Sequence, residues 1–165
     1  EDENIVHVDG EVNPLRDVET INLELILSDL ELVEKRLEKA RKSLKGNKSF
    51  KEEVDLLEKI LPVLEEGKSI RSLSFNDNEK AILKNFSLLS VKPIIYVANV
   101  NEDDMLDEGK SNEYVKVLND FAKQENSGIV VISAQIEKEI SELEDDEQIE
   151  FLNDLGILLS LLIIL

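Results

Sequence analysis

The apolar positions between residues 17 and 67 form two helical repeats separated by a short polar break. In each repeat the spacing alternates between four and three residues, which is the pattern of a coiled-coil seam. The first seam consists of Ile26, Leu30, Val33, Leu37, Ala40 and Leu44, and the second of Phe50, Val54, Leu57, Leu61 and Leu64. The break is Gly46-Asn47. This pattern predicts an antiparallel helical hairpin over residues 17–67.

Local signals predict where these helices begin and end. Pro14 is expected to stop regular structure, so the first helix is predicted to begin at about Asp17. Ser49 and Glu52 have the spacing of a capping box at the start of the second helix. Pro62 removes one amide from that helix, and we expect it to kink or shorten the helix.

Beyond Gly67 the pattern changes to alternating helices and strands. Two apolar runs, 92–100 and 129–132, are typical of strands buried in a parallel sheet. Helices are predicted at about 76–85, 112–124, 136–143 and 146–155. The strand-helix-strand order indicates an α/β fold with a parallel sheet. Residues 4–8 are interpreted as one further strand.

The predicted organisation has four parts. Residues 1–16 form a strand and a loop, 17–67 the inserted hairpin, and 68–157 the remaining α/β domain. Residues 158–165 form an apolar tail. The whole apolar run at 157–165 is too short to cross a bilayer, which takes about 20 residues in a helix, so no membrane anchor is expected. We expect the chain to be an internal fragment of a longer protein.

Charge distinguishes the hairpin from the rest of the chain. The net charge of −18 excludes binding of nucleic acid over the whole surface. Residues 36–51 nevertheless carry seven basic side chains and one acidic side chain, or +6, which leaves −24 elsewhere. The tip residues Arg41, Lys42, Lys45 and Lys48 are candidates for contact with ribosomal RNA or protein. The alternative is that these cations only solvate exposed helix faces.

Several kinds of site are rejected on sequence grounds. The chain has no cysteine, so it has neither disulfides nor thiolate metal ligands. The single histidine, His7, has no nearby Ser or Cys motif and is interpreted as structural. Two acidic groups lack the spacing of a calcium loop and are interpreted as a turn and a helix start. They are Asp103-Asp104 and Asp145-Asp146-Glu147.

Polar residues follow both predicted strands at the edge of the sheet where ligands bind in α/β folds. Asn99, Val100 and Glu102 follow the first strand, and Ser133 and Ala134 follow the second. Taken separately, these residues are typical of a turn and a helix cap. Together they resemble the base-recognition motifs Asn-Lys-x-Asp and Ser-Ala of P-loop GTPases. Val100 and Glu102 replace the Lys and Asp, which predicts loss of strong guanine selectivity.

Longer strings of sequence resemble the YchF or Obg-like ATPase family and cover most of the chain. They lie at 4–15, 19–22, 57–65, 92–93, 96–102 and 151–156. The resemblance implies a cytoplasmic, ribosome-associated nucleotidase that prefers ATP to GTP and uses Mg²⁺. It also implies a P-loop GTPase-like doubly wound sheet with a coiled-coil insertion, of which this chain is the C-terminal part. Carried over by position, Asn99, Val100, Glu102, Ser133 and Ala134 bind the nucleotide base.

One family feature is absent from the printed sequence. It contains no G-x-x-x-x-G-K-[ST] loop, whose amides and lysine cradle phosphates and whose hydroxyl binds Mg²⁺. We therefore expect no catalytic residue and no metal ligand in this chain, and no ATPase activity from it in isolation. The alternative function is a non-catalytic hairpin that docks ribosomal RNA or protein through its basic tip.

Overall fold

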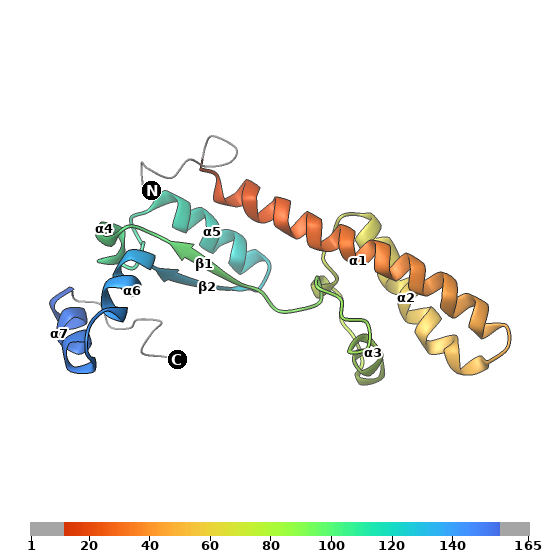
Figure 1. Cartoon of the computed structure of the whole chain (residues 1–165). Coiled ribbons are helices and arrows are strands. Elements are labelled where there is room, and N and C mark those ends of the chain that lie inside the picture. Colours follow the sequence, from red (N-terminus) through yellow and green to blue (C-terminus); the bar gives the residue numbers. More distant parts are fainter. Residues whose placement is uncertain (1–11, 156–165) are drawn as a thin grey trace. The chain divides into compact units, whose positions relative to one another are not determined.

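The structure, a computed structural model, describes residues 12–155 and divides the chain into two compact units (Figure 1). Arg16–Pro93 forms the hairpin unit, and the strand unit comprises the described residues of Glu1–Leu15 and Ile94–Leu165. The described residues contain seven α-helices, two 3-10 helices and two strands. The predicted strand at 4–8, His7 and the apolar run at 157–165 lie outside the described residues.

Helix α1 spans Pro14–Leu44 and therefore begins three residues before the expected start. The prediction that Pro14 ends regular structure was wrong. Proline suits the first position of a helix, because its fixed φ is helical and the amide that it lacks would have no partner there.

Helix α2 spans Lys51–Glu65 and follows a 3-10 turn, η1, at Lys48–Phe50. The predicted capping box of Ser49 and Glu52 does not form. The side chain of Asn47 instead accepts a hydrogen bond from the Ser49 amide at 2.9 Å, which starts the 3-10 turn ahead of α2. Helix α2 continues through Pro62 to Glu65, so the proline does not end the helix.

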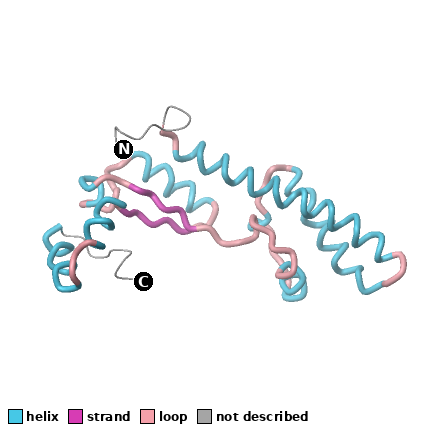
Figure 2. Tube along the Cα trace, viewed as in Figure 1, coloured by secondary structure: helices cyan, strands magenta, loops and turns pink. Residues whose placement is uncertain are grey.

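Helices α1 and α2 lie side by side and bury the predicted apolar seams (Figures 1 and 2). Of the eleven seam positions, seven are buried and four are partly buried. Two ion pairs cross between the helices: Arg36 Nε lies 2.8 Å from Glu53 Oε1, and Arg41 Nη2 lies 2.7 Å from Glu58 Oε1. Seam and ion pairs together hold the two helices as a hairpin.

A second apolar face of α2 is covered by the segment that follows it. Leu56 and Ile60 are buried, although neither belongs to the predicted seam. The covering segment comprises the 3-10 turn η2 (Ile70–Ser72) and helix α3 (Asp77–Leu83), with buried residues Ile70, Leu83, Phe86 and Leu88. The structure thus groups this segment, which the sequence analysis placed with the α/β domain, with the hairpin.

The buried carboxylate of Asp29 ties the end of this segment to α1. It is 2% exposed and accepts hydrogen bonds from the Leu89 amide at 2.9 Å, the Ser90 amide at 2.7 Å and the Ser90 hydroxyl at 2.6 Å. The Ser69 hydroxyl donates to the Ser90 carbonyl oxygen at 2.6 Å. These bonds position a turn sixty residues away in the sequence.

The strand unit is built on two parallel strands, β1 (Ile95–Asn99) and β2 (Gly128–Ile132), in which Asn99 pairs with Ile132. Helix α5 (Glu113–Gln124) connects them and contacts both strands. Tyr96 meets Phe121 of α5 edge to face at 6.0 Å between ring centres.

The strands are less buried than their apolar sequences predicted. Ile95 is 66% exposed and Val97 is 56% exposed. These residues alternate with the buried Tyr96, so the contacts of α5 cover only one face of the strand pair within the described residues. The predicted parallel pairing is confirmed, but the burial that the apolar runs predicted is found on only one face of the strand pair within the described residues.

Short helices complete the strand unit: α4 (Glu102–Met105), α6 (Ala134–Ser141) and α7 (Asp145–Leu155). Ile136 and Ile140 of α6 form a small core with Leu152 of α7. Within residues 12–155, no helix combines the length and the hydropathy that crossing a membrane requires.

Candidate functional site

The parallel pairing brings the two predicted motifs to the same edge of the strand pair. Asn99 is the last residue of β1 and pairs with Ile132, the last residue of β2. The amide of Val100 donates to the Ile132 carbonyl oxygen at 2.8 Å, so the pairing extends one residue past β1. Ser133 and Ala134 follow β2 directly.

A hydrogen bond joins the two motifs. The Ala134 amide donates to Asn99 Oδ1 at 2.9 Å, across 35 residues of sequence. This bond sets the orientation of the Asn99 side-chain amide, because the oxygen must face the N–H group. The two N–H groups of Nδ2 have no acceptor among the described residues, and Asn99 is exposed. The motif therefore presents hydrogen-bond donors at the strand edge.

Ser133 has a structural role in this arrangement. It is 2% exposed and is the N-cap of α6, where its hydroxyl accepts from the Ile136 amide at a long 3.5 Å. Since the Ala134 amide is taken by Asn99, the Gln135 amide is the one first-turn donor of α6 with no hydrogen bond among the described residues. Gln135 was not among the predicted site residues.

Helix α4 begins at Glu102, three residues after Asn99 at the end of β1. Asn101 caps α4 by accepting a hydrogen bond from the Asp104 amide at 2.8 Å, and Glu102 is the first residue of the helix. Glu102 is exposed, whereas Val100 is half-buried. No role was predicted for Asn101, although an Asn followed by three acidic residues is a typical helix start.

The turn after α4 is held by its own acidic side chains. Asp104 Oδ2 accepts from Asn112 Nδ2 at 2.8 Å, and Asp107 Oδ2 accepts from the Ser111 amide at 2.9 Å. The Ser111 side chain, and to a smaller extent the Ser111 amide, lower the pKa of the Asp107 carboxyl below its ordinary value. No group of three or more His, Cys, Asp or Glu residues in the described part of the chain is arranged to hold a metal ion.

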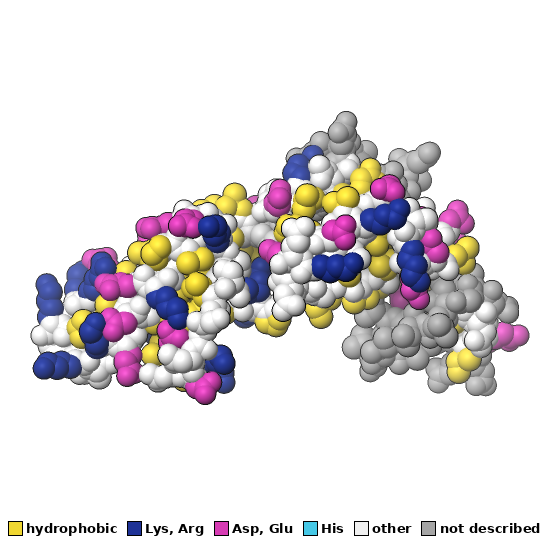
Figure 3. All heavy atoms as spheres, turned by 180° about the vertical axis from the view of Figure 1, so that it is seen from behind, with side chains coloured by type: hydrophobic (Ala, Val, Ile, Leu, Met, Phe, Trp, Pro, Cys, Tyr) yellow, Lys and Arg dark blue, Asp and Glu magenta, His cyan; other side chains and the backbone are white. Residues whose placement is uncertain are grey.

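The four predicted cations at the hairpin tip separate into two pairs. Arg41 and Lys42 have acidic partners, Glu58 at 2.7 Å and Glu38 at 2.5 Å. Lys45 and Lys48 are exposed and form no ion pair with any described residue. Figure 3 shows this end of the hairpin, where Lys and Arg side chains gather with acidic side chains among them.

No protein-family model matches the chain. The Ribosome-binding ATPase YchF of Pasteurella multocida is 44% identical over 158 residues, which are 95% of this chain and 42% of that protein. Its Bacillus subtilis counterpart is 45% identical over 157 residues, 94% of this chain and 43% of that protein.

A solved structure agrees with the sequence comparison. The YchF GTPase of Schizosaccharomyces pombe superimposes with a TM-score of 0.82 at 31% identity, covering 95% of this chain and 43% of that one. The chain thus spans about two fifths of the length of the relatives that it matches. By sequence and by structure, the chain belongs to the YchF family.

Proposed function

We propose that this chain supplies the base-reading edge of the nucleotide site in a cytoplasmic, ribosome-associated P-loop nucleotidase that prefers ATP to GTP. The observation that carries the proposal is the hydrogen bond from the Ala134 amide to Asn99 Oδ1. It leaves the donors of Asn99 Nδ2 for a ligand. The relatives, named as a ribosome-binding ATPase and as a GTPase, support the same assignment.

The chemistry of the edge matches a purine and favours adenine. Both purines present N7 as an acceptor, which the Nδ2 donors of Asn99 satisfy. At position 6, adenine presents an amino donor and guanine a carbonyl acceptor. A carboxylate can accept a hydrogen bond from the adenine 6-amino group. Guanine presents two adjacent N–H groups that an Asp carboxylate accepts together, and the longer Glu102 side chain alters that pairing, so strong guanine selectivity should be lost. Val100 offers an apolar contact to the face of the base.

Hydrolysis requires parts that the printed sequence lacks. Phosphate binding uses the amides and lysine of a P-loop, and Mg²⁺ is held by its hydroxyl. We therefore assign ATP or GTP hydrolysis and Mg²⁺ binding to the longer protein. The isolated chain should bind the nucleoside portion weakly, with a dissociation constant of about 1 mM or higher, and hydrolyse nothing.

The fold supports this proposal. Ile95 and Val97 are exposed apolar residues on a face of β1 that none of the described residues covers, whereas helices cover both faces of a doubly wound sheet. We infer that β1 and β2 belong to a larger sheet of that kind in the longer protein. The α1–α2 hairpin, with its heptad seam, is then a coiled-coil insertion between the parts of that sheet.

Nucleoside titrations monitored by NMR test the base site on the 165-residue chain. Adenosine should shift the Asn99 side-chain amide signals and the Ala134 backbone amide signal. Asn99→Ala should abolish the adenosine-induced shift of the Ala134 signal, whereas Asn85→Ala in the hairpin unit should not. The double variant V100K/E102D restores the Lys and Asp of the guanine motif and should raise guanosine affinity relative to adenosine by about tenfold. The assignment would be refuted if adenosine still shifted the Ala134 NMR signal of Asn99→Ala. It would also be refuted if the ratio of guanosine affinity to adenosine affinity were unchanged in the double variant.

A second function is favoured by the two tip lysines without ion pairs. Lys45 and Lys48 form no ion pair with any described residue, so they can meet a partner's phosphates or carboxylates without first breaking one, whereas Arg41 and Lys42 have acidic partners to exchange. We propose that the hairpin docks ribosomal RNA or protein through Lys45 and Lys48. This function requires no catalysis in the chain.

Co-sedimentation with ribosomes tests the tip. Reversing Lys45 and Lys48 to Glu should weaken ribosome binding by about tenfold at low salt. Each lysine that contacts a phosphate releases counterions, and the variant loses this favourable contribution. Reversal of Lys84 and Lys92, two exposed lysines of the same unit, is the matched control and should have little effect. Equal losses from both pairs would show that only net charge matters, and unchanged binding in the tip variant would exclude the tip.

A further inference from the structure

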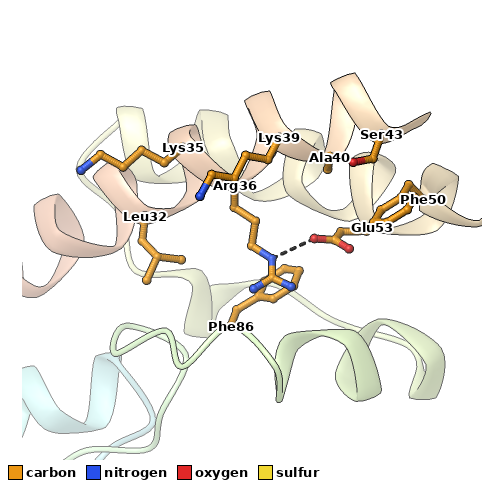
Figure 4. A pocket seen from close by; sticks show the side chains of 9 residues that line it. All are labelled: Leu32, Lys35, Arg36, Lys39, Ala40, Ser43, Phe50, Glu53 and Phe86. Atoms are coloured by element: carbon orange, nitrogen blue, oxygen red, sulfur yellow. Dashed lines mark hydrogen bonds and ion pairs between the residues drawn. The ribbon is translucent and has the colours of Figure 1, made fainter. Parts of the chain in front are cut away.

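A groove of about 470 Å³ lies along α1 beside the start of α2 (Figure 4). Its lining combines apolar and cationic side chains: Leu32, Lys35, Arg36, Lys39, Ala40, Ser43, Phe50, Glu53 and Phe86. It contains none of the predicted base-site or tip residues. The proposed functions leave this groove without a role.

Three cations of α1 line the groove, and they differ in how firmly they are held. Arg36 is fixed, because its Nε donates to Glu53 at 2.8 Å and its guanidinium lies 4.1 Å above the centre of the Phe86 ring. Its Nη1 reaches the Asn85 carbonyl oxygen at 3.4 Å, and its Nη2 has no acceptor among the described residues. The groove therefore contains a fixed guanidinium whose Nη2 group can donate to a ligand.

The two lysines can exchange partners at little cost. Lys35 pairs with Glu31, but both side chains are more than two-thirds exposed, and exposed pairs of this kind contribute at most about 0.5 kcal/mol. Lys39 is exposed and forms no ion pair with any described residue. In Figure 4 the Lys39 side chain reaches toward Arg36, and the Lys35 side chain extends along α1 away from Arg36.

The apolar lining favours a peptide over a nucleic acid base. Bases bind proteins by stacking on exposed aromatic faces. Phe86 is 2% exposed and is covered by Arg36, so it offers no such face, and Phe50 is half-buried. Leu32, by contrast, is 38% exposed, and it lines the groove together with Lys35, Arg36 and Lys39. An apolar surface with a cationic border complements an acidic segment that carries aliphatic side chains.

We propose that this groove docks an acidic protein segment, which packs an aliphatic side chain on Leu32 and places carboxylates against Lys35, Lys39 and Arg36 Nη2. The occupant is a protein chain with Asp or Glu on either side of a Leu-sized anchor. The groove is independent of the proposed base site and of the hairpin tip.

Fluorescence anisotropy with the 165-residue chain tests the proposal. The probe is a short fluorescein-labelled peptide rich in Asp and Glu, with Leu residues at helical spacing. Two control peptides replace either every Leu with Ser or every acid with its amide. Lys39→Glu and Leu32→Asp should each weaken binding of the probe about tenfold, or about 1.4 kcal/mol. Lys84→Glu, a reversal outside the groove, should leave it unchanged, and each control peptide should bind more weakly than the probe.

Several results would overturn the proposal, provided that circular dichroism shows the variants to be as helical as the parent chain. One is probe binding that is unaffected by both groove variants. Another is a Leu-free peptide that binds as tightly as the probe, which would mean attraction by charge alone. An oligouridine that outcompetes the probe and depends on the same residues would assign the groove to RNA. Self-association in sedimentation velocity that is lost in the groove variants would assign it to a second copy of the chain.

Discussion

Replacing Asp29 with Ala removes the acceptor that ties the turn at Leu89 and Ser90 to α1. Asp29 is 2% exposed, and all three of its hydrogen bonds come from these two residues. Ser90 is 1% exposed, so its amide and hydroxyl would have no access to water after the substitution. Leu89 is 38% exposed, and its amide is expected to recover a water partner.

The expected cost follows from the donors left without acceptors. Each buried donor without a partner costs about 1–3 kcal/mol, so the two donors of Ser90 account for about 2–6 kcal/mol. Part of this is offset because the variant no longer buries a carboxylate, which is itself unfavourable. We expect Asp29→Ala to lower the free energy of unfolding by about 2–3 kcal/mol.

Asp29→Asn provides the decisive comparison. The amide oxygen can keep both Ser90 bonds, while its NH₂ group faces only the exposed Leu89 amide. The expected cost is therefore about 1 kcal/mol, clearly smaller than that of the Ala variant. Ser28→Ala, at an exposed position on the same helix, is the control and should change stability by less than about 0.5 kcal/mol.

Urea unfolding monitored by far-UV circular dichroism measures these differences, with linear extrapolation to water. The reasoning would be refuted if Asp29→Ala cost less than about 1 kcal/mol, or if Asn and Ala were equally destabilising. Either result would mean that the hydrogen bonds to Ser90 contribute nothing that water does not replace.

Three other predictions concern the backbone and surface charge. Gly109→Ala should lower the free energy of unfolding by about 1–3 kcal/mol, because Gly109 has φ of +72° and an added Cβ would lie 3.1 Å from a valine methyl group. A thermal-shift assay measures the loss, and Gly46→Ala, whose added Cβ would meet no atom closer than 3.9 Å, is the control. Asn76→Ala removes the capping box of α3 and should cost about 1 kcal/mol in urea unfolding, and no change would mean that the cap is dispensable. The pKa of Glu79 is lowered below 4.5, mainly by the Lys59 side chain and to a smaller extent by the Asn76 amide. The stabilising contribution of the ionised Glu79 is therefore complete above that value and is lost as pH falls through the lowered pKa. Melting temperatures between about pH 6 and about pH 3 should accordingly fall more steeply for the parent chain than for Glu79→Gln, and parallel curves would contradict this.

Helix starts show how far local sequence reasoning extends. The predicted helices near 76 and 112 begin where Asn76 and Asn112 cap them. The cap predicted at Ser49 did not form, since Asn47 accepts the Ser49 amide first. Competing caps two residues apart differ little in energy, so their outcome is not decided by a motif alone.

Apolar periodicity located one face of each hairpin helix but not the second face of α2. A repeat of three and four residues identifies the stripe that meets a partner helix. Leu56 and Ile60 are buried in a core that also includes Ile70 and Phe86, which follow in the chain. Nothing in the local spacing specifies that contact.

The sequence by itself determined the hairpin seams, the order of strands and helices in the strand unit, and the motif residues after each strand. Local periodicity and turn chemistry suffice for these, because their interactions span only a few residues. Only the tertiary structure decided that the Ala134 amide orients Asn99, that Asp29 holds the turn at Ser90, and which cations of the basic run keep no partner. Each depends on groups distant in sequence that meet only when the chain has folded, so no local pattern carries them.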